Sequence, residues 1–315
     1  GGFIATYWHW RWIFWINVPV GVIGLALALA FVPRLRAEAA PPFDRAGFAL
    51  SGLGLSGLLF GFSVIGHGQV PPQVATALIV AGAVLMGLYL LHYRRAERPI
   101  LDFSLLRFAT FRASITGGFA FRIAVGAIPF LLPLMLQLGL GMTAFQSGSL
   151  TFLSTIGALT MKFTVGRIVR RFGFRPVLVA NGILSAGFVF ATGAFALGLP
   201  HWVMIAVLLV SGFFRSLQFT CINVVAYADV PDAAMSRATS LASVAQQVSL
   251  SCGVAIGALV LETLRAASPG HVLQPHDFFV GFMVVGASAL IAPFIFARLP
   301  RDAGAHMAAG RGHAA

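Results

Sequence analysis

Two arginines lie well inside long apolar segments, where a charged side chain is unusual. Arg122 lies within the segment 113–137, and Arg215 lies near the middle of the segment 202–226. A charge in hydrocarbon costs several kcal/mol, so such residues usually face the interior of a helix bundle and contact an ion, a substrate or a polar partner. We therefore expect them to recognise or move a ligand, with structural pairing between helices as the alternative for each.

Uncharged polar residues recur at helical spacing in the same kind of segment. Those that share one face of the segment 238–261 are Ser240, Ser243, Gln247 and Ser251. Such a stripe faces either a cavity or another helix. Gln137 continues the Arg122 face, while Gln218 and Asn223 lie near the Arg215 face. These residues are candidates for a ligand pathway, and hydrogen bonding between helices is the alternative.

The remaining charged residues lie near segment ends. Lys162 is within one turn of the end of the segment 144–165, where its side chain can reach the headgroups or serve the pathway. None of the nine acidic residues lies at mid-membrane. A proton-coupled carrier needs a buried group that changes protonation, so we expect the proton carrier in a part of the protein that this sequence does not contain.

Metal, cofactor and catalytic signatures are missing from the sequence. Cys221 and Cys252 have no spacing typical of a metal site, and neither HExxH nor GxSxG occurs. We therefore predict no metal, no cofactor and no enzyme activity.

Transmembrane helices must position these side chains. Of the 315 residues, 58% are hydrophobic and 10% are charged, against about 25% charged in soluble domains. Segments near twenty residues can cross about 30 Å of hydrocarbon as helices. The predicted spans are 12–33, 46–66, 73–93, 113–137, 144–165, 176–199, 202–226, 238–261 and 277–298. The predicted fold is therefore all-α and integral to the membrane, with GxxxG pairs at Gly57/Gly61 and Gly253/Gly257 permitting close helix packing.

Basic residues sort to alternate connections between these spans. The opposite face has only Arg11 and Arg265. The basic face has Arg34, Arg36, Arg45, Arg94, Arg95, Arg98, Arg107, Arg112, Lys162, Arg167, Arg170, Arg171, Arg175, Arg237, Arg298, Arg301 and Arg311. The positive-inside rule then predicts a cytoplasmic C-terminus in a bacterial inner membrane. It also accounts for the net charge of +12 without a nucleic-acid partner.

A motif at the start of the chain resembles a known transporter family. Gly1-Gly2 and the run from Trp10 to Gly21 are similar to the segment that joins spans 5 and 6 in fourteen-span drug:proton antiporters of the major facilitator superfamily, the EmrB/QacA branch. There the glycine pair ends a GPxxGG antiporter motif. The resemblance implies that the chain is N-terminally truncated and contains family spans 6 to 14.

Further motifs stay in register with that family. The segment 166–176 resembles the C-half copy of the loop motif GxLADRxGRR, although Arg170 stands where that motif has Asp. From the residues alone we predict a short basic turn here, with Gly173 as the residue that breaks the helix. The other motif positions are Gly166, Arg171 and Arg175. Runs such as 121–133 and 216–220, and the pair Met161-Lys162, are similar to the MdtD-type subgroup.

This resemblance implies a domain organisation and a function. Residues 1–36 would end the N-terminal six-helix bundle, 37–112 would form a two-span insertion, 113–299 would form the C-terminal six-helix bundle, and 300–315 a cytoplasmic tail. The implied function is proton-driven export of small organic molecules by alternating access, of the multidrug type. Because two buried arginines repel cations, an exporter of organic anions or metal chelates is the alternative.

The expected partners follow from that function. They are a small-molecule substrate, protons and the lipid bilayer, with the chain acting as a monomer. No periplasmic adaptor can be identified from the sequence.

Overall fold

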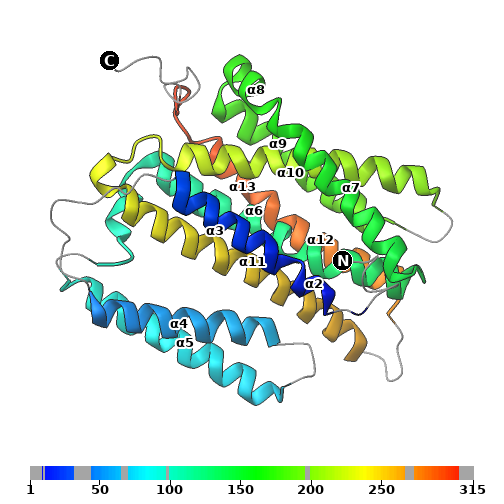
Figure 1. The fold of residues 1–315 in the computed structure, drawn as a ribbon, viewed down its shortest axis with the longest axis horizontal. Helices are drawn as coiled ribbons and strands as arrows, with labels where there is room; N and C mark the ends of the chain where they lie inside the picture. The colour runs from blue at the N-terminus through cyan, green and yellow to red at the C-terminus, as the bar shows by residue number, and fades with distance from the viewer. Residues whose placement is uncertain are drawn as a thin grey trace.

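The structure is a computed structural model, and it describes residue 9 and residues 11–31, 44–64, 70–96, 99–195, 199–266 and 273–304. Gly1, Gly2 and the predicted tail beyond residue 304 lie outside these ranges. Every element in the described part of the chain is helical. The long helices run roughly alongside one another as a bundle, with the pair α4 and α5 at one flank (Figure 1).

The first helices are α2 (Trp12–Trp15), α3 (Asn17–Phe31), α4 (Arg45–Val64) and α5 (Pro72–Tyr93). A 3₁₀ turn, η1 (Phe103–Arg107), leads to α6 (Ala109–Leu134) and a π-helical turn, η2 (Met135–Gly139). The bundle continues with α7 (Ala144–Lys162), α8 (Val165–Phe172), α9 (Phe174–Gly193) and α10 (His201–Ala226). It ends with η3 (Asp232–Ala234), α11 (Met235–Ala266), α12 (Pro275–Ala289) and α13 (Ile291–Phe296).

Each predicted span coincides with an apolar helix in the described chain. Seven helices are long and apolar enough to cross a membrane, and α7 with α8 makes an eighth if the bent pair is taken together. The first predicted span, 12–33, corresponds to α2 and the 15-residue α3, which Ile16 separates. At about 1.5 Å per residue α3 alone is shorter than the hydrocarbon layer.

Local chemistry explains where several helices begin and end. Asp44 accepts a 2.8 Å hydrogen bond from the Gly47 amide and so caps α4. Thr143 and Gln146 form a capping box at the start of α7. Gly173, with φ of 78°, occupies a conformation that other residues rarely adopt, and it separates α8 from α9. The prediction of a break at Gly173 is confirmed, whereas the preceding turn is in fact the helix α8.

Glycines allow the closest approaches between helices. An added Cβ at Gly157 or Gly212 would overlap the backbone oxygens of Leu209 or Ser154, so α7 and α10 meet backbone to backbone. Gly253 approaches the Ile123 carbonyl in the same way, joining α11 to α6. The predicted role of Gly253 is therefore confirmed.

The other predicted GxxxG glycines also lie at helix contacts. A Cβ at Gly57 would meet the Leu78 carbonyl at 3.0 Å, and one at Gly61 would meet the Ala75 carbonyl at 3.2 Å, both on α5. Gly257 differs, because its neighbour on α6 is a side chain, that of Leu131. The helical hairpin of α4 and α5 is therefore packed through glycine, and it also contacts α11.

Apolar side chains fill the space between α6, α9, α10 and α12. The large residues buried there include Phe121, Phe278, Phe282 and Phe296. A second cluster, which includes Tyr89, Leu101, Phe111 and Val230, joins the end of α5 to the start of α6 and the connection between α10 and α11. Because lipid tails are as apolar as these side chains, the two clusters hold the bundle together through close van der Waals packing.

One end of the bundle, which we call the basic end, contains the connections α5–α6 and α10–α11, helix α8 and residues 299–304. Phe296, at the end of α13, packs on Gly117 near the start of α6, and Gly304 contacts Phe174 at the start of α9. At this end Arg237 on α11 donates a 2.7 Å hydrogen bond to Asp102. Thr110 on α6 donates to Asp229 at 2.8 Å. Polar contacts thus tie several connections together where the predicted basic loops lie.

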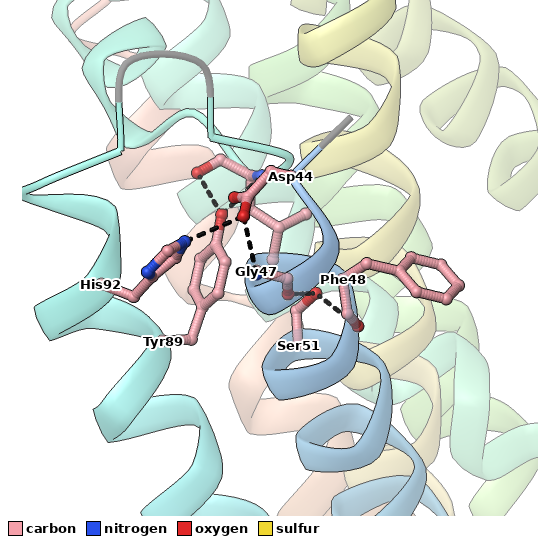
Figure 2. A network of polar contacts seen from close by, with 7 residues as sticks. Asp44, Gly47, Phe48, Ser51, Tyr89 and His92 are labelled. Atoms are coloured by element: carbon pink, nitrogen blue, oxygen red, sulfur yellow. Dashed lines mark hydrogen bonds and ion pairs between the residues drawn. The ribbon is translucent and has the colours of Figure 1, made fainter. Parts of the chain in front are cut away.

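The start of α4 and the end of α5 share a polar network at the same end (Figure 2). The His92 imidazole lies 2.9 Å from the Asp44 carboxylate. The Tyr89 hydroxyl accepts from the Leu101 amide at 2.7 Å and donates to the Leu101 carbonyl at 3.1 Å. These bonds fix the hairpin against the chain segment that leads into α6.

The glycine contact between α7 and α10 gives a stability prediction. Gly212→Ala forces these helices apart, and we expect a loss of about 1–3 kcal/mol, seen as a lower melting temperature of the full-length protein in detergent. Gly187→Ala is the matched control, because a Cβ there meets nothing within 4 Å. An equal melting temperature for the two variants would contradict the close packing.

Candidate substrate and coupling site

Arg122 is buried within α6 and reaches across to α10. Its side chain is 3% exposed. One guanidinium nitrogen, Nη2, donates a 2.8 Å hydrogen bond to Oδ1 of Asn223. The guanidinium carbon lies 5.2 Å from the centre of the Phe219 ring, within the range of a cation–π contact. Gly118 leaves room for this arrangement, because a Cβ there would lie 2.7 Å from Nη1.

The positive charge of Arg122 has no acidic partner and few hydrogen-bond acceptors among the described residues. A guanidinium carries five N–H donors, and the buried Nε of Arg122 has no hydrogen-bond partner in the described part of the chain. The ion pairs found among the described residues, Arg237–Asp102 and His92–Asp44, are both at the basic end. A buried cation without a counter-charge is unfavourable, so an added anionic or hydrogen-bond-accepting group would be stabilised here.

Arg215 lies elsewhere on α10 and faces α7. Its Nη2 donates to the Ser154 hydroxyl at 3.3 Å, and the side chain is half-buried. The neighbouring Ser216 hydroxyl donates to the Ala158 carbonyl at 3.2 Å, also on α7. Arg215 therefore lies beside the closest helix contact of the bundle, with one weak neutral hydrogen bond.

Gln218 is completely buried and binds α9. Its Nε2 donates to the Leu178 carbonyl at 3.0 Å, and its Oε1 accepts from Asn181 at 2.8 Å. Asn181 also donates to the Phe214 carbonyl at 2.9 Å. The expectation that Gln218 and Asn223 lie near the Arg215 face needs refinement, because the three side chains bind α9, α6 and α7 respectively.

Several other candidates are exposed in the structure. They are Gln137 in η2, Ser243 and Gln247 on α11, and Lys162 at the end of α7. Ser240 and Ser251 are half-buried on the same α11 stripe. Among the described residues the stripe has no hydrogen bond or ion pair to another helix, so its residues stay candidates for a ligand-facing surface.

The loop motif lies on α8 and its junction with α9. Arg170 and Arg171 are exposed in the last turn of α8, Gly166 lies near its start, and Arg175 follows Gly173 at the beginning of α9. α8 bends away from α7 by 57°. Gly1 and Gly2, the predicted antiporter-motif remnant, lie outside the described residues.

Sequence reasoning did not anticipate Asn181, Phe219 and Ser154 as partners. Asn181 is an isolated polar residue within the predicted span 176–199, a signal that could have identified it. Ser154 and Phe219 are common residue types in such helices and give no comparable signal. In the part of the chain that the structure describes, no three His, Cys, Asp or Glu side chains form a group that could hold a metal ion.

Comparison with known proteins adds to this geometry. A family model described as Major Facilitator Superfamily matches residues 1–253 and, in a second alignment, 114–313. The chain is 34% identical over 99% of its length to proteins of Escherichia coli O157:H7 (strain EC4115 / EHEC), Escherichia coli (strain K12 / DH10B) and Shigella boydii serotype 18. All three carry the provisional name multidrug resistance protein MdtD. The chain spans 66% of their length.

The contact between Arg122 and Asn223 predicts an energetic coupling. Asn223→Leu removes the hydrogen bond from a buried cation, and we expect a loss of about 1.5–3 kcal/mol. Adding Arg122→Met should recover part of that loss, because no charge is then left unpaired. Melting temperatures of the full-length protein in detergent test this cycle, with the exposed Gln247→Leu as control. Strictly additive effects of the two substitutions would contradict the coupling.

Proposed function

Because the chain belongs to the major facilitator superfamily, we propose that the whole protein is a proton-driven secondary transporter that exports small organic molecules across the bacterial cytoplasmic membrane. Movement would occur by alternating access, in which a site near the bilayer midplane opens to one side at a time. The name of the relatives, which refers to multidrug resistance, supports a drug-like substrate. The match covers nearly all of this chain.

The observation that carries the proposal is the uncompensated Arg122. A buried cation with one neutral hydrogen bond is an unstable arrangement that natural proteins retain mainly at functional positions. Asn223 and Phe219 hold the guanidinium in place, and both are only half-buried. The group is thus positioned by α10 while a neighbouring surface stays accessible to a ligand.

The proposed pathway uses side chains on α6, α7, α10 and α11. Arg122 and Asn223 would contact the substrate or respond to the coupled proton, and Arg215 would act at the α7–α10 contact. Gln137, Ser243 and Gln247 would contribute exposed polar groups, and Lys162 would lie near the cytoplasmic entrance of the pathway. Gln218 would act indirectly, by fixing the position of α10 against α9.

The proposed arrangement in the membrane follows the sequence domains. We propose that residues 37–112 are a two-span insertion and that 113–299 form the C-terminal six-helix bundle. The basic end would face the cytoplasm, with the C-terminus there. The loop motif on α8 would take part in the conformational change that opens the site to either side.

An exporter of organic anions or metal chelates is the second candidate. Neither Arg122 nor Arg215 has an acidic partner among the described residues, and two uncompensated cations repel a cationic drug. A carboxylate substrate would instead be attracted and could pair with the planar guanidinium through two hydrogen bonds. This electrostatic argument favours the anion over the lipophilic cation unless acidic residues elsewhere neutralise the site.

Transport in energised inverted vesicles distinguishes the two substrates. We expect the full-length protein to accumulate a carboxylate anion, and Arg122→Gln to reduce that uptake by about tenfold or more, because a charged hydrogen bond contributes about 1.5–3 kcal/mol. Arg122→Lys should retain a part of the activity, since it keeps the positive charge but cannot donate two parallel hydrogen bonds to a carboxylate. Arg112→Gln, an exposed arginine near the start of the same helix, is the matched control.

Each result assigns a role to the arginines. Loss of anion uptake in Arg122→Gln with normal uptake in Arg112→Gln supports a substrate contact. Uptake of a lipophilic cation that survives both Arg122→Gln and Arg215→Gln would return the arginines to structural roles and support the multidrug substrate class. If no tested compound shows proton-dependent uptake, the result would contradict the transporter proposal.

A further inference from the structure

An apolar groove lies at the basic end, between α8, α9 and α10. It has a volume of about 350 Å³. Its walls include Ile168 and Phe172 from α8, Val177 and Leu184 from α9, and Phe213 and Leu217 from α10. Exposed apolar surface of this kind on a membrane protein suits an acyl chain, which can pack against it through van der Waals contacts.

Hydrogen bonds hold the α9 and α10 walls of the groove together, so the groove exists before any ligand binds. Asn181, which lines it, ties α9 to α10 through the Phe214 carbonyl and the Gln218 side chain. The Asn181 Oδ1 atom is buried and has no hydrogen-bond partner within the described residues. The wall is therefore preformed and apolar apart from one acceptor atom.

Helix α8 places positive charge beside this groove, because the guanidinium carbon of Arg171 lies 5.6 Å from the centre of the Phe172 ring, which lines the groove. Its apolar residues Val165, Ile168, Val169 and Phe172 recur at helical spacing, and its arginines occupy the other face. Because α8 bends by 57° from α7, it leaves the direction of the span, as an amphipathic helix at a membrane surface does. Figure 1 shows α8 at one end of the bundle.

The arginines of α8 and of the start of α9 are available for an anion. Arg167, Arg170 and Arg171 are exposed, Arg175 is half-buried, and none of them forms an ion pair within the described chain. A phosphate group accepts hydrogen bonds from arginine more strongly than a neutral group does. Basic pockets at the inner side of membrane proteins bind anionic headgroups on this principle.

We propose that this groove is a binding site for an anionic phospholipid, with an acyl chain along the apolar wall and the phosphate at the arginines of α8. The apolar wall alone would accept any lipid, and the arginines alone would accept any anion. Their juxtaposition selects a ligand that has both parts, such as phosphatidylglycerol. The site is separate from Arg122, and the inference does not depend on which substrate is transported.

Native mass spectrometry of the full-length protein in detergent tests the site with dioleoylphosphatidylglycerol as the probe. We expect Arg170→Gln/Arg171→Gln to weaken binding by about tenfold to thirtyfold, because each surface arginine contributes roughly one factor of five. Ala180→Phe, which fills the groove from an exposed position on α9, should weaken it without changing any charge. The matched controls are Arg94→Gln/Arg95→Gln and Ala83→Phe, at exposed positions of α5 and its end.

Three further probes separate the ligand classes. Dioleoylphosphatidylcholine tests the need for net negative charge, inorganic phosphate tests the headgroup alone, and tetraphenylphosphonium tests a lipophilic cation. Tight binding of phosphatidylglycerol only, lost in both test variants and kept in both controls, supports the proposal.

Other results would overturn it. Equal weakening by Arg94→Gln/Arg95→Gln would mean general surface attraction, and unchanged binding in Ala180→Phe would mean that no chain occupies the groove. Phosphate or tetraphenylphosphonium binding as tightly as the lipid would assign the groove to another ligand. Melting temperatures of all variants, measured in phosphatidylcholine, show whether any loss of binding reflects unfolding.

Discussion

The buried charge of Arg122 constrains how α6 and α10 pack, because a charge in a low-dielectric interior needs polar partners that the neighbouring helices must supply. Asn223 supplies an oxygen at 2.8 Å and Phe219 a ring face at 5.2 Å, both from α10. Gly118 supplies space in α6 itself. The Arg122 side chain therefore adds a polar contact to the apolar packing of α6 against α10, and any movement that separates the two helices must break a hydrogen bond to a charge.

Helix α10 can hold Asn223 and Phe219 against Arg122 because α9 and α7 fix its own position. Gln218 binds α9 through the Leu178 carbonyl and Asn181, and Gly212 lets α10 touch the backbone of α7. In hydrocarbon such buried polar contacts have no competing water, so they specify which helices pair as well as adding stability. The same helix thus packs closely on α7, hydrogen-bonds to α9 and positions the charge of α6.

Composition and segment length were enough to predict the helical membrane fold, because a continuous apolar segment near twenty residues long can cross lipid with all its backbone hydrogen bonds satisfied only as a helix. They also predicted that Arg122, Gln218 and Asn223 make polar contacts inside the bundle, since polar residues inside apolar runs are few, and the structure has all three in hydrogen bonds between helices. They could not identify partners: Asn223 pairs with Arg122 and Gln218 with Asn181 because of how α6, α9 and α10 are arranged. The basic segment around Arg170 was expected to be a turn, whereas amphipathic spacing over 165–172 makes it a helix.

The arginines of this chain occupy two environments that treat the same charge differently. On α8, Arg170 and Arg171 are exposed, so solvent can stabilise their charges at little cost. In α6, Arg122 has lost most of that solvation and gained one neutral hydrogen bond. The electrostatic attraction between an anion and Arg122 is correspondingly stronger, because it increases as the surrounding dielectric constant falls. A ligand that carries a carboxylate would therefore be distinguished from a neutral one mainly inside the bundle, while the surface arginines would set how the protein sits among charged lipids.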